Sequence, residues 1–314
     1  MLITKEHFDK IYKENKIPYT CMVLMLNEDC NANCKVCIGR QTFKSELCKK
    51  VCEGFKVECR HCCGRTATDD VYFNRIDAIL KTVNSPFVQI ILTGGEPTIS
   101  NRLIPAMELI DKYNFEAKML EIESNGANLL DEKISSELIK RNVKILLSRY
   151  CIDDKLNAEE FGYVSKKTTN KDIKKMAKLY KENLTLNTIL LKKYMPNSKA
   201  VLEFVDFYRQ YGIKNFDFTE FLADTSLRNA NKELFKYYDE QFVSIKDVSA
   251  GMTEKVREFT DGVFTIVYYK YKDCEIAFSS SIMSKQKDAK TKSDSGRFLI
   301  MPSGEIGVNG IETR

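Results

Sequence analysis

Three cysteines within eight residues, Cys30, Cys34 and Cys37, are the residues of this sequence whose type and spacing most directly imply chemistry. They read Cys-x3-Cys-x2-Cys and follow the apolar run 19–26. Thiolates bind soft metals, and a cubane iron–sulfur cluster normally takes four of them. Three thiolates leave one iron open to a substrate or cofactor, although alone they would also make part of a tetrahedral zinc site. The spacing therefore predicts a metal centre in the loop after the first strand.

A second group of cysteines lies in an insertion over residues 38–67, which has little apolar periodicity. Its members are Cys48, Cys52, Cys59, Cys62 and Cys63, with His61 beside them. Four such ligands suit either a second iron–sulfur cluster or a structural zinc ion, and a set of free thiols is the third interpretation. Eight of the eleven cysteines lie between Cys30 and Cys63, a density that packing does not explain. We therefore expect an auxiliary metal site in the insertion.

Gly94-Gly95-Glu96-Pro97 follows the apolar run 87–92 and is another candidate site. Two glycines let the backbone approach a ligand closely, and carbonyl and carboxylate oxygens suit a ligand ammonium. An ordinary turn would also explain the two glycines. Polar residues follow two later apolar runs, as Ser124-Asn125-Gly126 and Ser148-Arg149-Tyr150. If these runs are parallel strands, all of the polar segments meet at one edge of the sheet.

Apolar runs alternate with amphipathic segments along residues 19–221. We predict strands over 19–26, 87–92, 118–123, 143–147, 184–191 and 216–221, and helices over 70–83, 101–113, 131–141, 170–182 and 198–211. This alternation predicts a parallel sheet with crossover helices. An open doubly wound sheet and a barrel both satisfy the pattern, and both place a ligand site at the carboxyl ends of the strands.

Two regions flank this α/β unit. Residues 1–17 are predicted to form a charged N-terminal helix. Within residues 225–314 we predict helices over 231–243 and 251–260, one hairpin of 263–271 with 274–280, a mobile loop at 283–296, and a last hairpin of 297–301 with 305–308. We interpret the region 225–314 as a small α+β extension that closes a barrel.

Composition excludes several classes of function. Lys and Arg number 49 against 44 Asp and Glu, a mild excess of +5, and the basic stretches alternate with polar or acidic residues. Such stretches are typical of solvated helix faces, so we expect no nucleic-acid or membrane contact. No run reaches the roughly 18 apolar residues of a membrane span, and the charged N-terminus is not a secretory signal. Eleven cysteines without such a signal favour metal ligands in a reducing compartment, so we expect a cytoplasmic protein.

With these motifs together, the chain resembles the radical S-adenosylmethionine (SAM) enzymes over roughly residues 18–222. The resemblance implies that residues 18–224 form that family's partial (β/α)6 barrel, an α/β fold similar to a TIM barrel. It implies that Cys30, Cys34 and Cys37 hold an oxygen-sensitive 4Fe-4S cluster whose open iron binds SAM. The SAM contacts that it implies are Gly94, Gly95, Glu96, Pro97, Ser124, Asn125 and Ser148. The family's Ser-Leu-Asp motif lacks its Asp here, so Arg149 becomes a candidate contact for the SAM carboxylate.

Within that family the chain is most similar to the GTP cyclase of molybdenum-cofactor synthesis. Residues 187–192 resemble a strand motif whose lysine contacts the nucleotide, so Lys192 is expected to anchor the substrate, with Lys193 competing for that role. Residues 218–221 resemble the next strand motif, which makes Glu220 a candidate catalytic residue. The hairpin 297–308 also resembles the cyclase, but no cysteine follows it. We therefore expect neither a C-terminal cluster, nor a SPASM extension, nor GTP cyclisation.

The resulting hypothesis is a biosynthetic enzyme that cleaves SAM to a 5'-deoxyadenosyl radical, which abstracts hydrogen from a small-molecule or nucleotide-like substrate. A flavodoxin or ferredoxin would supply the electron. One alternative is a peptide maturase or epimerase in which the Cys151 thiol returns a hydrogen atom, although Cys151 also suits a core position and roughly 18 residues before the first strand are few for a leader-binding domain. Another is a zinc-binding nucleic-acid module, which leaves Gly94 to Pro97 and the β/α alternation unexplained.

Overall fold

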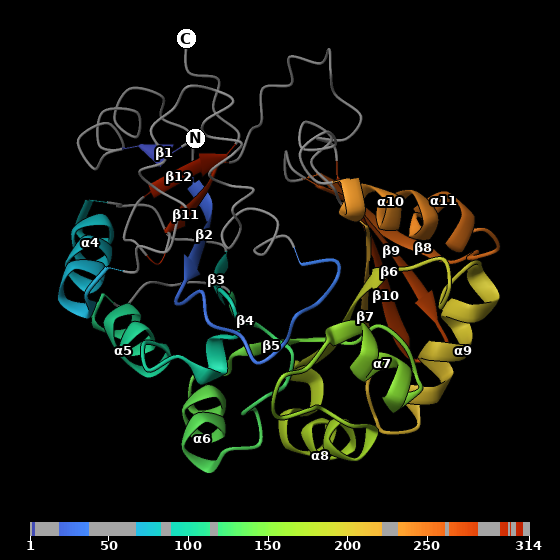
Figure 1. The fold of residues 1–314 in the computed structure, drawn as a ribbon, viewed down its shortest axis with the longest axis horizontal. Coiled ribbons are helices and arrows are strands. Elements are labelled where there is room, and N and C mark those ends of the chain that lie inside the picture. The colour runs from blue at the N-terminus through green and yellow to red at the C-terminus, as the bar shows by residue number, and fades with distance from the viewer. Residues whose placement is uncertain are drawn as a thin grey trace, which may run out of the picture.

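The described residues form one sheet of twelve strands. Its six central strands follow one another in the sheet in the same order as in the chain, and they run parallel (Figure 1). The computed structural model describes residues 2–3, 19–37, 67–82, 89–113, 119–221, 232–260, 264–281, 296–300, 302 and 306–309. The strands are β1 (Leu2–Ile3), β2 (Tyr19–Met25), β3 (Gln89–Thr93), β4 (Met119–Ser124), β5 (Lys144–Ser148), β6 (Leu184–Leu190), β7 (Asn215–Glu220), β8 (Lys255–Thr260), β9 (Phe264–Tyr271), β10 (Cys274–Ser281), β11 (Gly296–Ile300) and β12 (Ile306–Asn309). Their order in the sheet is β1-β12-β11-β2-β3-β4-β5-β6-β7-β10-β9-β8.

Helices cover the outer side of the curved sheet, as Figure 1 shows for α4, α5, α6, α8 and α9. The α-helices are α4 (Asp69–Thr82), α5 (Leu103–Lys112), α6 (Glu132–Lys140), α7 (Asp154–Phe161), α8 (Asn170–Tyr180), α9 (Ser198–Arg209), α10 (Lys232–Gln241) and α11 (Ile245–Val248), and the 3-10 helices are η1 (Pro97–Ile99) and η2 (Lys181–Asn183). The predicted alternation of six parallel strands with helices is confirmed, with element bounds shifted by a few residues.

Alternation along each strand gives the sheet two different faces. Ile90, Leu92 and Ile145 are fully buried and belong to one core cluster with Leu103 and Met107 of α5. These residues face the helices, so the residues between them face the inner side of the sheet. The hydrophobic core therefore lies between the outer face of the sheet and the helices, and the side chains of the inner face are outside this contact.

The C-terminal strands extend the main sheet at both ends, and in this they differ from the separate closing layer that the sequence predicted. β10 lies parallel to β7, while β11 lies parallel to β2, although these pairs are far apart in the sequence. The two predicted hairpins are confirmed as β9 with β10 and β11 with β12. The described strand order begins at β1 and ends at β8, so it gives an open sheet.

Three predicted elements need correction. The helix predicted over 251–260 is wrong, because Lys255–Thr260 forms β8 and pairs with β9; cross-strand pairing there overrides the helix preference of its Lys, Arg and Glu residues. The N-terminal helix is wrong at Leu2–Ile3, which pairs with β12. The segment assigned to a loop before residue 170 contains α7, capped by Asp153 at its start and by Gly162 at its end.

Several predictions fall outside the described residues. These are the rest of the N-terminal segment before Tyr19, the insertion with its cysteines Cys48, Cys52, Cys59, Cys62 and Cys63, and the loop 283–295. In the described part of the chain, no helix has both the length and the apolar character needed to cross a membrane.

Arg102, directly before α5, joins four segments next to the end of β2. Its side chain is almost fully buried, and it donates to the carbonyl oxygens of Leu26 (3.3 Å), Pro302 (3.1 Å) and Ala67. Its Nε atom lies 2.7 Å from the Asp69 carboxylate at the start of α4. Because Leu26 is the last residue before the cysteines' loop, Arg102 fixes the point at which that loop leaves the sheet.

Arg102→Met is expected to lower the free energy of unfolding by about 3 kcal/mol, because it leaves buried carbonyl oxygens without a donor. Urea denaturation would measure the change. Lys199→Met, which removes an exposed pair with Glu203 at 4.0 Å, is the matched control and should cost less than about 0.5 kcal/mol. Equal losses in the two variants would contradict the role given to Arg102.

Candidate active site

The three cysteines lie on a loop, residues 27–37, that we call the cysteine loop. It follows β2 and rests on the turn after β3 through backbone hydrogen bonds. The Gly95 N–H donates to the Asn27 carbonyl and the Glu96 N–H donates to the Asp29 carbonyl, both at 2.8 Å. The end of the sheet ladder therefore continues into the loop, and the turn at 94–97 is the floor on which the loop lies.

The two glycines of that turn are required by the cysteine loop itself. A Cβ atom on Gly94 would lie 2.6 Å from the Asn27 carbonyl oxygen, and one on Gly95 would lie 2.1 Å from the Asp29 carbonyl oxygen. Gly94 also has a φ of 141°, which other residues rarely adopt. The backbone at these two glycines closely approaches the loop backbone, whereas the sequence analysis predicted a close approach to a ligand. Contact with SAM stays a prediction.

Glu96 is a buried carboxylate at the centre of the site, with 1% of its surface exposed. It accepts hydrogen bonds from the hydroxyls of Thr98 (2.6 Å) and Ser124 (2.7 Å) and from the backbone N–H groups of Thr98 (3.0 Å) and Asn125 (2.7 Å). Burial raises the pKa of Glu96, and these donors oppose that effect. Glu96 thus joins the ends of β3 and β4, and it brings together predicted site residues from two separate motifs.

Asn125 carries this connection onward to the cysteine loop. Its side-chain amide donates to the Asn31 side-chain oxygen at 2.8 Å and to the Cys30 sulfur at 3.7 Å. Its carbonyl oxygen accepts from the Thr168 hydroxyl at 2.7 Å. Asn125 therefore positions Cys30, and in this structure its polar atoms are all bound to protein groups.

Cys30, Cys34 and Cys37 are all partly exposed and none forms a disulfide. Burial, followed by the negative charge of Cys37 and Cys30, raises the pKa of Cys34 to about 12. The sulfur atoms therefore lie near enough to repel one another as thiolates. A bound metal cation reverses that penalty, since it favours the deprotonated form of its ligands.

The three thiols fit part of an iron–sulfur cluster and equally part of a zinc site. In the described part of the chain, no three His, Cys, Asp or Glu side chains gather closely enough to share one ion. A zinc ion would draw the thiolates to about 3.8 Å from one another, because each Zn–S bond is about 2.3 Å long. In a 4Fe-4S cluster each thiolate binds a separate iron, so three thiolates on one loop could supply three of its four usual protein ligands.

Residues 161–166 support the opposite side of the cysteine loop. The Asn33 N–H donates to the Phe161 carbonyl at 2.8 Å, and the Val164 N–H donates to the Asn31 carbonyl at 2.9 Å. The Asn31 amide also donates to the Lys166 carbonyl at 2.8 Å. No motif in the sequence assigns these residues to the site, because α7 itself was not predicted.

Arg149 is placed where the sequence put it, at the end of β5, but it is buried among protein acceptors. It donates to the Tyr208 hydroxyl (2.8 Å), the Cys151 carbonyl (2.7 Å), the Asp154 carboxylate (2.8 Å) and the Asn170 side-chain oxygen (3.2 Å). Only 1% of its surface is exposed. Arg149 is therefore paired with Asp154 within the protein, and its predicted contact with the SAM carboxylate stays a prediction. Ser148 beside it is half-buried.

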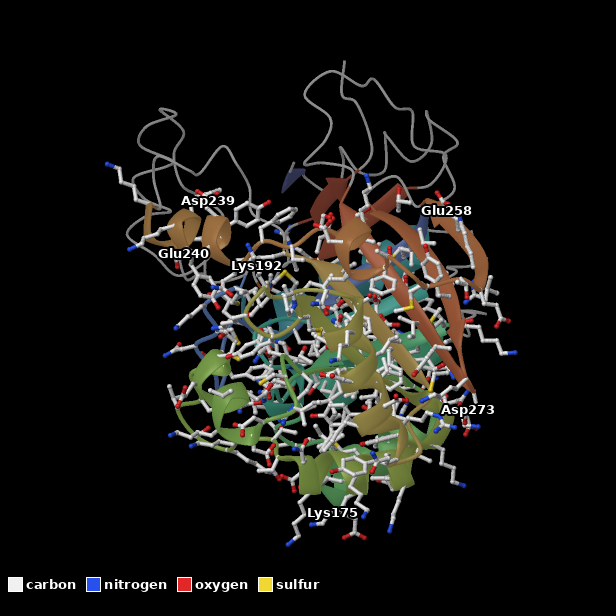
Figure 2. The ribbon with its side chains drawn as sticks, turned by 90° about the vertical axis from the view of Figure 1, so that its right-hand side faces the viewer. Lys175, Lys192, Asp239, Glu240, Glu258 and Asp273 are labelled. Carbon is white, nitrogen blue, oxygen red and sulfur yellow. The ribbon has the colours of Figure 1, made fainter. Side chains whose placement is uncertain are left out.

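The predicted substrate residues Lys192 and Glu220 both form hydrogen bonds with residues 241–245, where α10 ends and α11 begins. Lys192 is exposed beside the end of α10 (Figure 2), where its backbone N–H donates to the Gln241 carbonyl at 2.8 Å. Glu220 is buried and accepts from the Ile245 N–H at 2.9 Å, so it caps α11. Both therefore have structural partners in this arrangement, and their predicted roles in substrate binding and catalysis gain no support from it.

Cys151 lies just past β5 and is 7% exposed. Its thiol donates to the Asp153 carbonyl at 3.5 Å. Burial raises the pKa of Cys151 to about 11, so the thiol stays protonated at neutral pH. A protonated thiol is the form that returns a hydrogen atom, and that role remains a prediction.

The inner face of the sheet carries polar residues that the sequence analysis missed. The Thr93 hydroxyl donates to Glu123 at 2.8 Å, and the Ser279 hydroxyl donates to Asp217 at 3.1 Å. Burial and the nearby charge of Glu123 raise the pKa of Asp217 to about 6, although the Ser279 hydrogen bond opposes this. Every second residue of β4 and β7 is polar in part of each strand, which could have indicated a polar inner face. The sequence analysis uses only the apolar positions of these strands.

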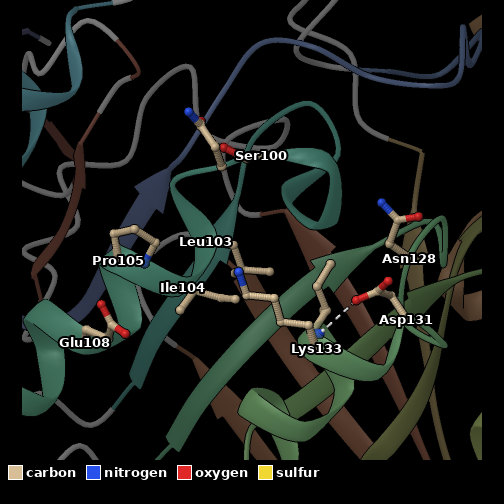
Figure 3. A pocket seen from close by; sticks show the side chains of 10 residues that line it. Ser100, Leu103, Ile104, Pro105, Glu108, Asn128, Asp131 and Lys133 are labelled. Atoms are coloured by element: carbon tan, nitrogen blue, oxygen red, sulfur yellow. Dashed lines mark hydrogen bonds between the residues drawn. The ribbon is translucent and has the colours of Figure 1, made fainter.

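A groove between α5 and α6 lies apart from this site (Figure 3). It is lined by residues such as Leu103, Ile104, Glu108, Asp131 and Lys133, which include none of the predicted site residues.

No model of a known protein family and no curated protein matches this sequence. Solved structures do match. SuiB of Streptococcus suis, both alone and bound to S-adenosylmethionine, has a TM-score of 0.54 and 15% identity, and the match covers 96% of this chain and 63% of SuiB. SuiB bound to the precursor peptide SuiA has a TM-score of 0.51 and 16% identity, over 96% of this chain and 62% of SuiB. The likeness shows a shared fold, and this chain spans less than two thirds of the length of SuiB.

Gly95→Ala is expected to displace the cysteine loop from the turn at 94–97, because the new methyl group would overlap the Asp29 carbonyl. We expect a loss of about 2 kcal/mol in the free energy of unfolding, measured by urea denaturation, and loss of most of the iron bound on anaerobic reconstitution. Gly212→Ala is the control for backbone strain, since Gly212 has a φ of 92° that strains Ala, but a Cβ atom there would meet no other residue within 4 Å beyond its chain neighbours, so the iron content should be unchanged. If Gly95→Ala keeps full iron content, the turn does not support the loop as described.

Proposed function

We propose that this chain is a radical SAM enzyme. The observation that carries the proposal is the position of the cysteine loop, at the carboxyl ends of parallel strands and on a floor made by Gly94, Gly95 and Glu96. Ligands of parallel α/β folds bind at that edge. The fold is similar to that of SuiB, which has been crystallised with S-adenosylmethionine. The six central strands are, in this proposal, a partial (β/α)6 barrel.

The group that this site would hold is a 4Fe-4S cluster on Cys30, Cys34 and Cys37, which together with SAM supplies reductive cleavage to a 5'-deoxyadenosyl radical. The protein's own part is to position and shield. Glu96 fixes the turn and the end of β4, and Asn125 holds Cys30. The carbonyl groups of Gly94 and Gly95 are the proposed acceptors for the SAM ammonium, since the Glu96 carboxylate is already bound to protein donors.

The substrate is proposed to be bound on the inner face of the sheet, above the polar residues Glu123 and Asp217. A small molecule or nucleotide was the expectation from the sequence, which rests on Lys192 and on likeness to the GTP cyclase. The comparisons favour a second candidate, a peptide, because SuiB bound to a precursor peptide matches 96% of this chain. For either substrate, a flavodoxin or ferredoxin is the proposed electron donor.

The insertion is proposed to hold an auxiliary centre, either a second cluster or zinc. The proposal rests on the soft ligands between Cys48 and Cys63 and on their position directly after the cysteine loop.

Anaerobic reconstitution with iron and sulfide tests the function. We expect a brown protein that releases 5'-deoxyadenosine from SAM under reducing conditions, measured by liquid chromatography. Cys34→Ala should abolish this release, while Cys274→Ala, which removes a buried thiol outside the site, should retain it. About four irons per chain indicate one cubane and about eight indicate two, the second of which Cys48→Ala with Cys59→Ala should remove. A colourless protein that binds only zinc would contradict the proposal.

A further inference from the structure

Glu160, at the end of α7, is a second buried carboxylate, and the mechanism above gives it no role. It is 1% exposed. It accepts hydrogen bonds from the Lys193 ammonium at 2.5 Å, the Tyr237 hydroxyl at 2.5 Å and the Tyr194 hydroxyl at 3.3 Å. We call these four residues the Glu160 cluster. Its members come from α7, from the segment after β6 and from α10, so it joins three separate parts of the chain.

The same stretch of chain holds the cysteine loop. Phe161, the residue after Glu160, accepts from the Asn33 N–H at 2.8 Å. Gly162 then turns the chain with a φ of 55°, and a Cβ atom there would lie 3.1 Å from the Asn33 carbonyl oxygen. Only one or two residues therefore separate Glu160 from the backbone atoms that contact the cysteine loop, so a movement of Glu160 would move these contacts.

Tyr237 of α10 touches the cysteine loop from the other side. The Lys35 ammonium, between Cys34 and Cys37, lies 5.6 Å from the centre of the Tyr237 ring, and the Lys193 ammonium lies 5.3 Å from it. Phe235 of α10 is buried in a cluster that also includes Val36 of the loop. The helix thus packs on the loop with aromatic and apolar side chains, and one buried carboxylate fixes its orientation.

We propose that Glu160 is a positioning residue that holds α10 against the cysteine loop and thereby shields the three thiols from solvent and oxidants. A buried carboxylate with three donors is costly to disrupt, since removal of any donor leaves part of its charge uncompensated. The proposed restriction of access to the thiols, which are partly exposed, rests on the geometry alone. Shielding of a bound cluster from oxygen rests in addition on the proposed function.

The first test uses the metal-free, reduced protein and a short pulse of iodoacetamide. Alkylation is quantified by mass spectrometry on the peptide that contains Cys30, Cys34 and Cys37, relative to the peptide of Cys274, which is 2% exposed in β10. Tyr237→Phe keeps the ring and loses the hydroxyl. We expect it to raise the relative alkylation rate about tenfold. The loss of one hydrogen bond to a charged group makes the local opening of α10 away from the loop more favourable by about that factor. Lys193→Met should act in the same direction.

Tyr113→Phe is the matched control, because it removes a tyrosine–carboxylate hydrogen bond, to Asp77 at 2.5 Å, between the end of α5 and α4, which contain neither the cysteine loop nor Cys274. It should leave the relative rate unchanged. A general loss of stability would raise alkylation of Cys274 as well, so the ratio separates positioning from unfolding. If the relative alkylation rates of Tyr237→Phe and Lys193→Met equal that of Tyr113→Phe, the proposal is overturned.

The second test follows bleaching of the reconstituted protein in air by its visible absorbance. Tyr237→Phe should bleach several-fold faster than Tyr113→Phe, and equal rates would overturn the shielding of the cluster. If neither the wild type nor any variant assembles a cluster, the proposed function fails. The alkylation ratio then still decides the role of Glu160.

Discussion

The burial of the Glu96 carboxylate is the interaction on which the rest of the site depends. A carboxylate with 1% of its surface exposed is stable only where donors replace its lost hydration, and here four donors do so. Those donors belong to η1 and to the end of β4, so the carboxylate fixes these elements relative to each other. The backbone of the same residue holds the cysteine loop through Asp29. One residue therefore fixes both the turn at 94–97 and the position of the loop that carries the three cysteines.

The second support comes from outside the six central strands. α7 and α10 hold the far side of the cysteine loop, and they are joined through Glu160. The loop is thus held between two buried carboxylates, one on each side, while its three sulfur atoms stay partly exposed. This arrangement keeps the ligands in place before any metal is bound, which reduces the ordering cost of binding.

The sequence predicted the parallel strands well, because buried apolar runs and their spacing are local properties of the chain. It also predicted which motifs meet, since the carboxyl ends of parallel strands share one edge. It failed where a contact between distant segments decides the structure. The residues 255–260 became a strand because β9 lies beside them. The contacts of Arg149 with Tyr208 and Asp154 were likewise not visible in the sequence. The sequence indicated that Gly95 lies at a close approach of the backbone, but the group that it approaches, the Asp29 carbonyl, is visible only in three dimensions.

The central claim is that Cys30, Cys34 and Cys37 leave one iron open for SAM. Electron paramagnetic resonance of the reduced, reconstituted protein, recorded with and without SAM, tests it most directly. We expect the signal of a reduced 4Fe-4S cluster whose g values shift when SAM is added, because a new ligand enters at the open iron. A reduced cluster whose spectrum is unchanged at saturating SAM would contradict the claim.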